Sequence, residues 1–125
     1  MTWLVSPPED TGWRLDPGVV VARLRERWPE AAIREVTQPS RRHVSHEWTV
    51  SMPHGRLDGR FFPRHSGLHL DGHLEDAVTF AVWYRSLAPD DQVVWFNDDA
   101  YTMHVDVRPG ATEDDLLAAV EGAAG

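Results

Sequence analysis

The stretch that decides the fold is residues 44–52, VSHEWTVSM. Its apolar side chains recur at every second position, with Ser, Glu and Thr between them. Alternation with a period of two is typical of a strand with one buried face and one solvent face, as in antiparallel sheets. The buried face of this strand would hold Val44, His46, Trp48, Val50 and Met52. The first expectation is therefore a half-buried antiparallel sheet.

Strand patterns recur on both sides of this stretch. Short apolar or alternating runs are separated by Pro, Gly, Asn and Asp, which favour turns. Residues 97–99, NDD, predict a tight turn of this kind. The expected strands are residues 2–6 (at a sheet edge), 32–37, 44–52, 57–62, 67–71, 92–96 (central) and 101–107.

Three helices are predicted. The first begins at Asp16 and Pro17, because Asp is a good N-cap and Pro suits the first helical position. The second covers Leu74–Leu87 and is apolar nearly all round, so we expect it at the centre of the core. The third follows Thr112 and Asp115, which resemble a capping box with Asp in place of Glu, and ends at Gly122.

The expected order is strand, helix, three or four strands, helix, two strands, helix. Runs of strands separated by helices predict an α+β fold, with one antiparallel sheet of about five to seven strands and helices packed on it. A chain of 125 residues has room for one core, so we expect a single domain over residues 1–125.

This element order resembles two classes of small bacterial protein. With the first strand set aside and residues 57–71 counted as one interrupted strand, the order over residues 16–122 is similar to that of type III secretion chaperones. Those are small acidic proteins that dimerise and bind a partner chain. Small bacterial immunity proteins are a second acidic, partner-binding class with α+β folds. The resemblance implies a protein-binding role, and a homodimer is one way to cover edge strands.

The composition argues against several kinds of partner and of stabilising site. All 12 basic residues are Arg, Lys and Cys are absent, and 20 acidic residues give a net charge of −8. We therefore expect no duplex nucleic acid partner, no disulfide framework and no Cys-based zinc site. Arg without Lys is typical of a GC-rich bacterial genome. No signal peptide or membrane-spanning run is visible, so we expect a cytoplasmic protein.

The negative charge is concentrated in the second part of the chain. Residues 1–70 carry 10 Arg and 8 Asp or Glu, a net charge of +2, whereas residues 71–125 carry 2 Arg and 12 Asp or Glu, a net charge of −10. Helix starts and turns explain some of these carboxylates, but not the scarcity of Arg. Such a segment would steer a basic partner protein. The predicted partner-binding residues are Asp71, Glu75, Asp76, Asp90, Asp91, Asp98, Asp99 and Trp13.

A small-ligand or metal-binding domain is the alternative interpretation. His65, His69 and His73 recur every four residues, and imidazole is a good ligand for Zn²⁺ or Fe²⁺. In an extended strand, however, His65 and His69 would lie about 13 Å apart, so one ion would need a bent chain. His43 and His46 are a second pair, although His46 falls on the apolar face of its strand, where a hydrogen-bonded, partly buried His is expected. The basic cluster Arg41-Arg42-His43 could bind a phosphate or a carboxylate.

No reaction is indicated by a motif. The chain has neither a G-x-S-x-G elbow nor a Gly-rich phosphate loop, and no pair of carboxylates is placed by its spacing in a cleft. We therefore predict a protein that is not an enzyme, with no catalytic residues and no cofactor.

Overall fold

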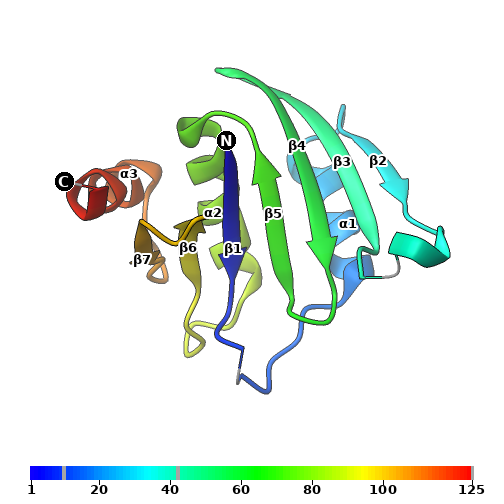
Figure 1. Ribbon diagram of the computed structural model, residues 1–125, viewed down its shortest axis with the longest axis horizontal. Coiled ribbons are helices and arrows are strands. Elements are labelled where there is room, and N and C mark those ends of the chain that lie inside the picture. The colour runs from blue at the N-terminus through cyan, green and yellow to red at the C-terminus, as the bar shows by residue number, and fades with distance from the viewer. Residues whose placement is uncertain (10, 42, 125) are drawn as a thin grey trace.

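A computed structural model describes residues 1–9, 11–41 and 43–124 (Figure 1). Within these residues it has one seven-stranded sheet and three α-helices, so the predicted α+β fold is confirmed. The strands are β1 (Thr2–Ser6), β2 (Ala32–Glu35), β3 (His46–Met52), β4 (Gly55–Phe62), β5 (Gly67–Asp71), β6 (Trp95–Asp98) and β7 (His104–Asp106). The helices are α1 (Pro17–Arg27), α2 (Leu74–Leu87) and α3 (Glu113–Ala124), and η1 (Pro39–Arg41) is a short 3₁₀ turn.

The sheet has the strand order β2-β3-β4-β5-β1-β6-β7, and every neighbouring pair is antiparallel. Helices α1 and α2 lie behind the sheet in Figure 1, while α3 lies beside β7 at one end. The face toward the viewer carries no helix. In the described ranges, no helix combines the length and apolar character needed to cross a bilayer.

The core lies between the sheet and its two covering helices. Phe80 of α2 stacks on Trp28 with ring centroids 4.1 Å apart, and on Trp48 of β3 at 6.3 Å. Trp48 is fully buried because Gly59, its partner on β4, leaves room for the indole. A Cβ at Gly59 would lie 2.2 Å from the Trp48 Nε1 atom. The alternating pattern of residues 44–52 places Trp48 on the buried face of β3, next to a glycine on β4.

The starts of α1 and α3 agree with their sequence signals. Asp16 caps α1 by accepting a hydrogen bond from the Val19 amide at 3.2 Å. At α3, the Thr112 amide donates to Asp115 and the Asp115 amide donates to the Thr112 hydroxyl, both at 3.1 Å. The capping box with Asp is thus confirmed. The helix continues through Gly122, which was predicted to end it.

Strand β1 is central, and its prediction as an edge strand was wrong. It pairs with β5 on one side and with β6 on the other. Trp3 and Val5 point into the core, and this alternation suits a strand anywhere in the sheet. Because its partners lie far along the chain, no local pattern reveals its position.

The β6–β7 hairpin exists but its turn is shifted. Residues 97–99 were predicted as the turn, yet β6 continues to Asp98 and Asn97 pairs with His104 of β7. The Asp98 carboxylate accepts hydrogen bonds from the amides of Thr102 at 2.8 Å and Met103 at 3.2 Å. This side chain, rather than the backbone of residues 97–99, organises the turn. Tyr101, predicted in a strand, therefore lies in the turn.

Residues 57–62 and 67–71 lie in two separate strands, as their pattern predicted, and not in the one interrupted strand that the resemblance to type III secretion chaperones requires. β4 and β5 pair antiparallel, with Phe62 opposite Gly67, and residues 63–66 turn the chain between them. The condition under which the element order matched type III secretion chaperones is therefore not met.

Candidate functional site: the uncovered face of the sheet

The uncovered face carries one row of side chains that crosses all seven strands. The register aligns Arg34, Glu47, Arg60, His69, Leu4, Asn97 and His104 in strand order. Polar partners occupy both ends of the row. Glu47 accepts from Arg41 at 2.7 Å and from Arg34 at 3.3 Å, and this pairing with Arg41 lowers the Glu47 pKa. His104 Nδ1 lies 3.3 Å from Asn97 Oδ1. The middle of the row, from Arg60 to Leu4, makes no such ion pair in the part of the chain that is described.

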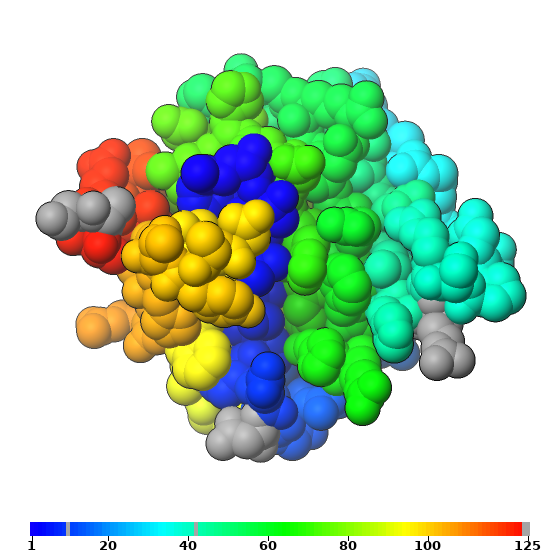
Figure 2. All heavy atoms as spheres, viewed as in Figure 1, coloured from blue at the N-terminus to red at the C-terminus, as the bar shows by residue number. Residues whose placement is uncertain are grey.

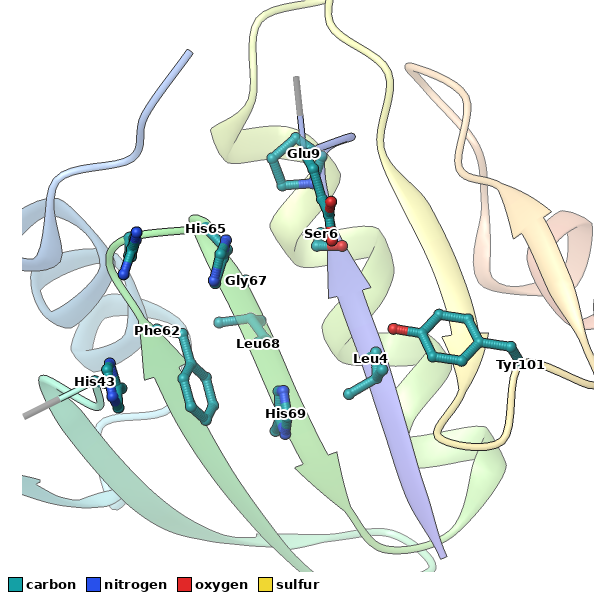
Figure 3. A pocket seen from close by; sticks show the side chains of 12 residues that line it. Leu4, Ser6, Glu9, His43, Phe62, His65, Gly67, Leu68, His69 and Tyr101 are labelled. Atoms are coloured by element: carbon teal, nitrogen blue, oxygen red, sulfur yellow. The ribbon is translucent and has the colours of Figure 1, made fainter. Parts of the chain in front are cut away.

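A cavity of about 420 Å³ opens beside the middle of this row. It is built from four separate segments of the chain: β1 with the loop after it, the segment just before β3, the β4–β5 hairpin, and the β6–β7 turn. Figure 3 shows Phe62 and His69 side by side at one wall and Tyr101 facing them across Leu4. Its volume falls in the range of small-molecule pockets, about 300–1,000 Å³.

Tyr101 stands between this cavity and a second hollow. The second hollow, of about 460 Å³, is lined by Trp95 and His104, and the two hollows share Tyr101. Figure 2 shows the β6–β7 segment, in yellow and orange, projecting over β1 on this face. Tyr101 has 70% of its surface exposed. An aromatic ring is therefore held in solvent above the sheet.

Two strained residues border the cavity. Within the described chain, the non-glycine residues with positive φ are Ser66, at 52°, and Tyr101, at 56°. Tyr101 lines the cavity, and Ser66 lies between His65 and Gly67, which both line it. Left-handed backbone is unfavourable for residues with a side chain, so such residues need support from their surroundings.

The β4–β5 turn is supported by the core. Ser66 is fully buried, and its hydroxyl accepts a hydrogen bond from the Leu15 amide at 2.8 Å. Its carbonyl accepts from the buried Tyr84 hydroxyl, and burial raises the Tyr84 pKa above its usual range. The turn that carries Arg64 and His65 is thus fixed from two directions.

The β6–β7 turn is supported by Asp98. This residue is 8% exposed, and besides the two amides its carboxylate accepts from the Thr102 hydroxyl. That hydroxyl, followed by the backbone amides, holds the Asp98 pKa below its usual value. The carboxylate therefore stays ionised and fixes the turn that presents Tyr101.

His69 is the central polar group of the cavity wall. Its ring centroid lies 4.2 Å from that of Phe62, and it pairs with Arg60 across the β4–β5 ladder. Burial, and secondly the charge of Arg60, lower the His69 pKa from its ordinary value of 6.5. At neutral pH His69 is therefore a neutral imidazole that offers one donor and one acceptor.

The predicted histidine segment is divided between two places. His65 and His69 line the cavity together with His43, whereas His73 precedes α2 and lies 6.4 Å, between ring centroids, from His54. Among residues 1–9, 11–41 and 43–124, no three His, Asp or Glu side chains are placed to hold a metal ion. The spacing of four thus does not assemble one site, because β5 keeps its strand geometry after His65.

Two of the predicted acidic residues are buried. Asp76 is 1% exposed and lies 3.2 Å from His54 Nδ1, and Asp98 serves the β6–β7 turn. Neither carboxylate is available to a partner. The exposed carboxylates of residues 71–125, which we call the acidic half, are Asp71, Glu75, Asp90, Asp91, Asp99, Asp106, Glu113, Asp114, Asp115 and Glu121.

Trp13 is partly buried. Its ring meets Tyr84 edge-on with centroids 6.4 Å apart, so it attaches its loop to the core. The same loop is joined to the segment after α2, where the Thr11 hydroxyl donates to Gln92 at 2.8 Å. Trp13 therefore lies at the end of the molecule that also carries Asp91 and the half-exposed Val93.

Arg–carboxylate ion pairs are unevenly distributed. In the described residues they join Arg23 to Glu26, Arg34 and Arg41 to Glu47, and Arg56 to Asp58, all within residues 1–70. Of the two Arg in residues 71–125, Arg85 is buried and donates to the carbonyls of Gln92, at 2.6 Å, and Pro89. Burial lowers the Arg85 pKa, and the nearby charge of Asp90 only partly offsets this effect.

Several cavity residues were not predicted. Arg64, Phe62 and Tyr101 belong to segments whose meeting depends on the central position of β1. For Tyr101 the sequence did contain a signal, the turn-forming run at residues 97–99. If the predicted turn is moved by two residues toward the C-terminus, Tyr101 lies in it. No family model, no curated protein and no solved structure matches the chain.

Proposed function

We propose that the protein is a non-enzymatic binding module whose acidic half recognises a basic partner protein. The observation that carries this proposal is the distribution of ion pairs. Every Arg–carboxylate pair of the described chain lies within residues 1–70, while the ten exposed carboxylates of the acidic half pair with no Arg. Asp71 pairs with the Met1 ammonium at 3.4 Å and Asp115 caps α3, but the other eight charges are open to interaction with another molecule.

Long-range attraction would set the rate of encounter. A field of one sign attracts a partner of opposite charge, and salt screens that attraction. Apolar groups would then hold the complex, because a few buried anchors supply most of the binding energy of an interface. Trp13 and Val93, next to Asp91, are the apolar groups best placed for this.

The test uses the purified basic products of the neighbouring genes. Each is titrated into the protein by calorimetry at low and at high salt. Binding that weakens at high salt is the expected result. If none of the products binds, or if binding does not respond to salt, the proposal fails.

Two triple variants with the same change in net charge locate the binding surface. The first neutralises the acidic half through Asp91→Asn, Asp99→Asn and Asp106→Asn. The control, Glu26→Gln, Glu30→Gln and Glu35→Gln, neutralises exposed carboxylates of the first part of the chain. We expect the first to slow association several-fold and the control to leave it nearly unchanged. Equal effects would contradict a role specific to the acidic half.

A homodimer stays a prediction of the sequence. In the described sheet, β2 and β7 are the edge strands, and pairing at an exposed edge is a common route to dimers. Sedimentation analysis over a range of protein concentrations distinguishes a dimer from a monomer.

A further inference from the structure

We propose that the cavity on the uncovered face binds a small aromatic carboxylic acid. For this purpose the cavity is defined by Leu4, Glu9, Phe62, Arg64, His69 and Tyr101 (Figure 3). This inference is independent of the acidic half and of the partner protein. It depends on the shape, the charge and the strain of the cavity.

Next to the cavity are two guanidinium groups that form no ion pair with any residue that the structure describes. Arg56 of β4 pairs with Asp58, but Arg60 and Arg64 form no ion pair within the described residues. Arg64 lines the cavity, and Arg60 lies over the Phe62 ring at 5.9 Å from its centroid. Arg60 lines the neighbouring hollow and stands opposite His69 of the cavity wall. In a chain where acidic residues outnumber Arg by 20 to 12, a cavity lined by an Arg of this kind favours an anionic ligand.

The cationic side of the cavity and the side that carries Tyr101 are formed by different segments. Arg64 and His69 come from the β4–β5 hairpin, whereas Leu4 and Tyr101 come from β1 and the β6–β7 turn. Glu9 lies beside Ser6 at the end of β1 (Figure 3). Its negative charge disfavours an anion at that end of the cavity, so the carboxylate of a ligand would bind on the side of Arg64. The matching ligand has a carboxylate at one end and a planar apolar body at the other.

The aromatic body is indicated by Tyr101. Its exposed ring extends from the β6–β7 turn toward β1 (Figure 3), and the residue holds a positive φ that Asn or Gly would adopt more easily. Strained backbone is found preferentially at ligand clamps, where the surroundings maintain it. Asp98 holds the backbone of the turn, so the direction in which the Tyr101 side chain leaves the turn is fixed before a ligand binds, and its ring can stack on an aromatic ligand.

His69 completes the recognition of the carboxylate. Because it is neutral, its ring donates one hydrogen bond without adding charge, and Phe62 fixes the ring in place. The volume of about 420 Å³ accommodates one or two fused rings with a short acidic chain.

The experiment uses three acids and their neutral amides as probes. Benzoate, phenylacetate and indole-3-acetate are titrated against the isotope-labelled protein, with the corresponding amides in parallel. We expect the resonances of Tyr101, His69 and Arg64 to move with at least one acid, which should bind about tenfold or more tightly than its amide. No shift with any acid at about 10 mM, well above the millimolar range of a weak complex, would overturn the proposal.

Three variants separate the cavity from general charge effects. Arg64→Gln removes the guanidinium from an exposed position, and Arg25→Gln makes the same change on α1, behind the sheet. We expect Arg64→Gln to weaken binding of the acid about fivefold or more and Arg25→Gln to leave it unchanged. Tyr101→Gly keeps the positive φ without strain but removes the ring, and it should weaken acid and amide alike. Equal affinity in Arg64→Gln and Arg25→Gln, or unchanged affinity in Tyr101→Gly, would contradict the site.

Discussion

Gly59 determines how the largest core side chain packs. A Cβ at this position would lie 2.2 Å from Trp48 Nε1, and both residues have strand partners on both sides. We expect Gly59→Ala to lower the free energy of unfolding by roughly 1–3 kcal/mol, because the indole must shift within a close-packed core. Urea denaturation measures this change.

Gly122→Ala is the matched control for this substitution. A Cβ at Gly122 meets nothing within 4 Å, and the residue lies inside α3. Alanine favours a helix over glycine, so we expect a gain of about 0.5–1 kcal/mol. A Gly59→Ala protein as stable as the wild type would show that Trp48 does not need the space.

His69 makes the stability of the protein depend on pH. Its pKa in the folded protein is lower than the ordinary value of 6.5, which we take for the unfolded chain. At a pH between these two pKa values, the unfolded chain therefore binds more protons than the folded protein. The contribution of the neutral His69 ring to stability is fully present when the pH is above the ordinary pKa. It is lost as the pH falls through the pKa that His69 has in the folded protein. We expect His69→Gln to lose less stability than the wild type between about pH 7.5 and pH 5.

Urea midpoints of the two proteins at both pH values measure this difference. Other groups with perturbed pKa values, such as Glu47 and Asp98, are common to both proteins, so they cancel in the comparison. Parallel pH profiles would contradict the assignment of the neutral imidazole.

At the scale of elements, the β6–β7 turn depends on one carboxylate. Asp98 accepts from two amides and a hydroxyl, and hydrogen bonds to charged groups each contribute about 1.5–3 kcal/mol. We expect Asp98→Asn to destabilise the turn and to speed amide exchange at Thr102 and Met103. Asp99→Asn, an exposed neighbour, is the control and should leave both amides protected. Equal exchange in the two variants would show that the backbone alone holds the turn.

The elements differ in how far the sequence could predict them. Helix α2 is predicted to the residue because its apolar pattern and the Pro after it are local. β4 and β5 are separated by Pro63, but whether such a break makes a bend or a hairpin depends on the distant Leu15 and Tyr84 that hold Ser66. Whether β1 lies at the edge or in the centre of the sheet likewise depends on contacts with distant parts of the chain.

At the scale of the whole molecule, the charge asymmetry should oppose folding. Carboxylates without Arg partners repel one another in the compact state, and salt screens this repulsion. We expect the melting temperature to rise with salt, and the triple variant Asp91→Asn, Asp99→Asn and Asp106→Asn to melt higher than the wild type at low salt. The control triple variant of residues 26–35 should show a smaller gain, since Glu26 pairs with Arg23. Scanning calorimetry at two salt concentrations provides the comparison.

The cavity shows what a single sequence leaves out. The charge split between residues 1–70 and 71–125 was countable from composition, and the ion pairs follow it. The composition could not show that Arg64, His69 and Tyr101 lie around one cavity, because the segments that carry them are brought together only through β1. Local patterns predict elements, whereas a site of this type is a product of topology.

The central position of β1 has a consequence for how the chain is made. Residues 2–6 are made before their partners on β5 and β6, which follow only when the chain reaches residues 71 and 98. The sheet therefore closes late in synthesis, and such distant pairings slow folding. Until then the Trp3 and Val5 side chains stay uncovered, so the nascent chain is most prone to aggregation before residue 98 emerges.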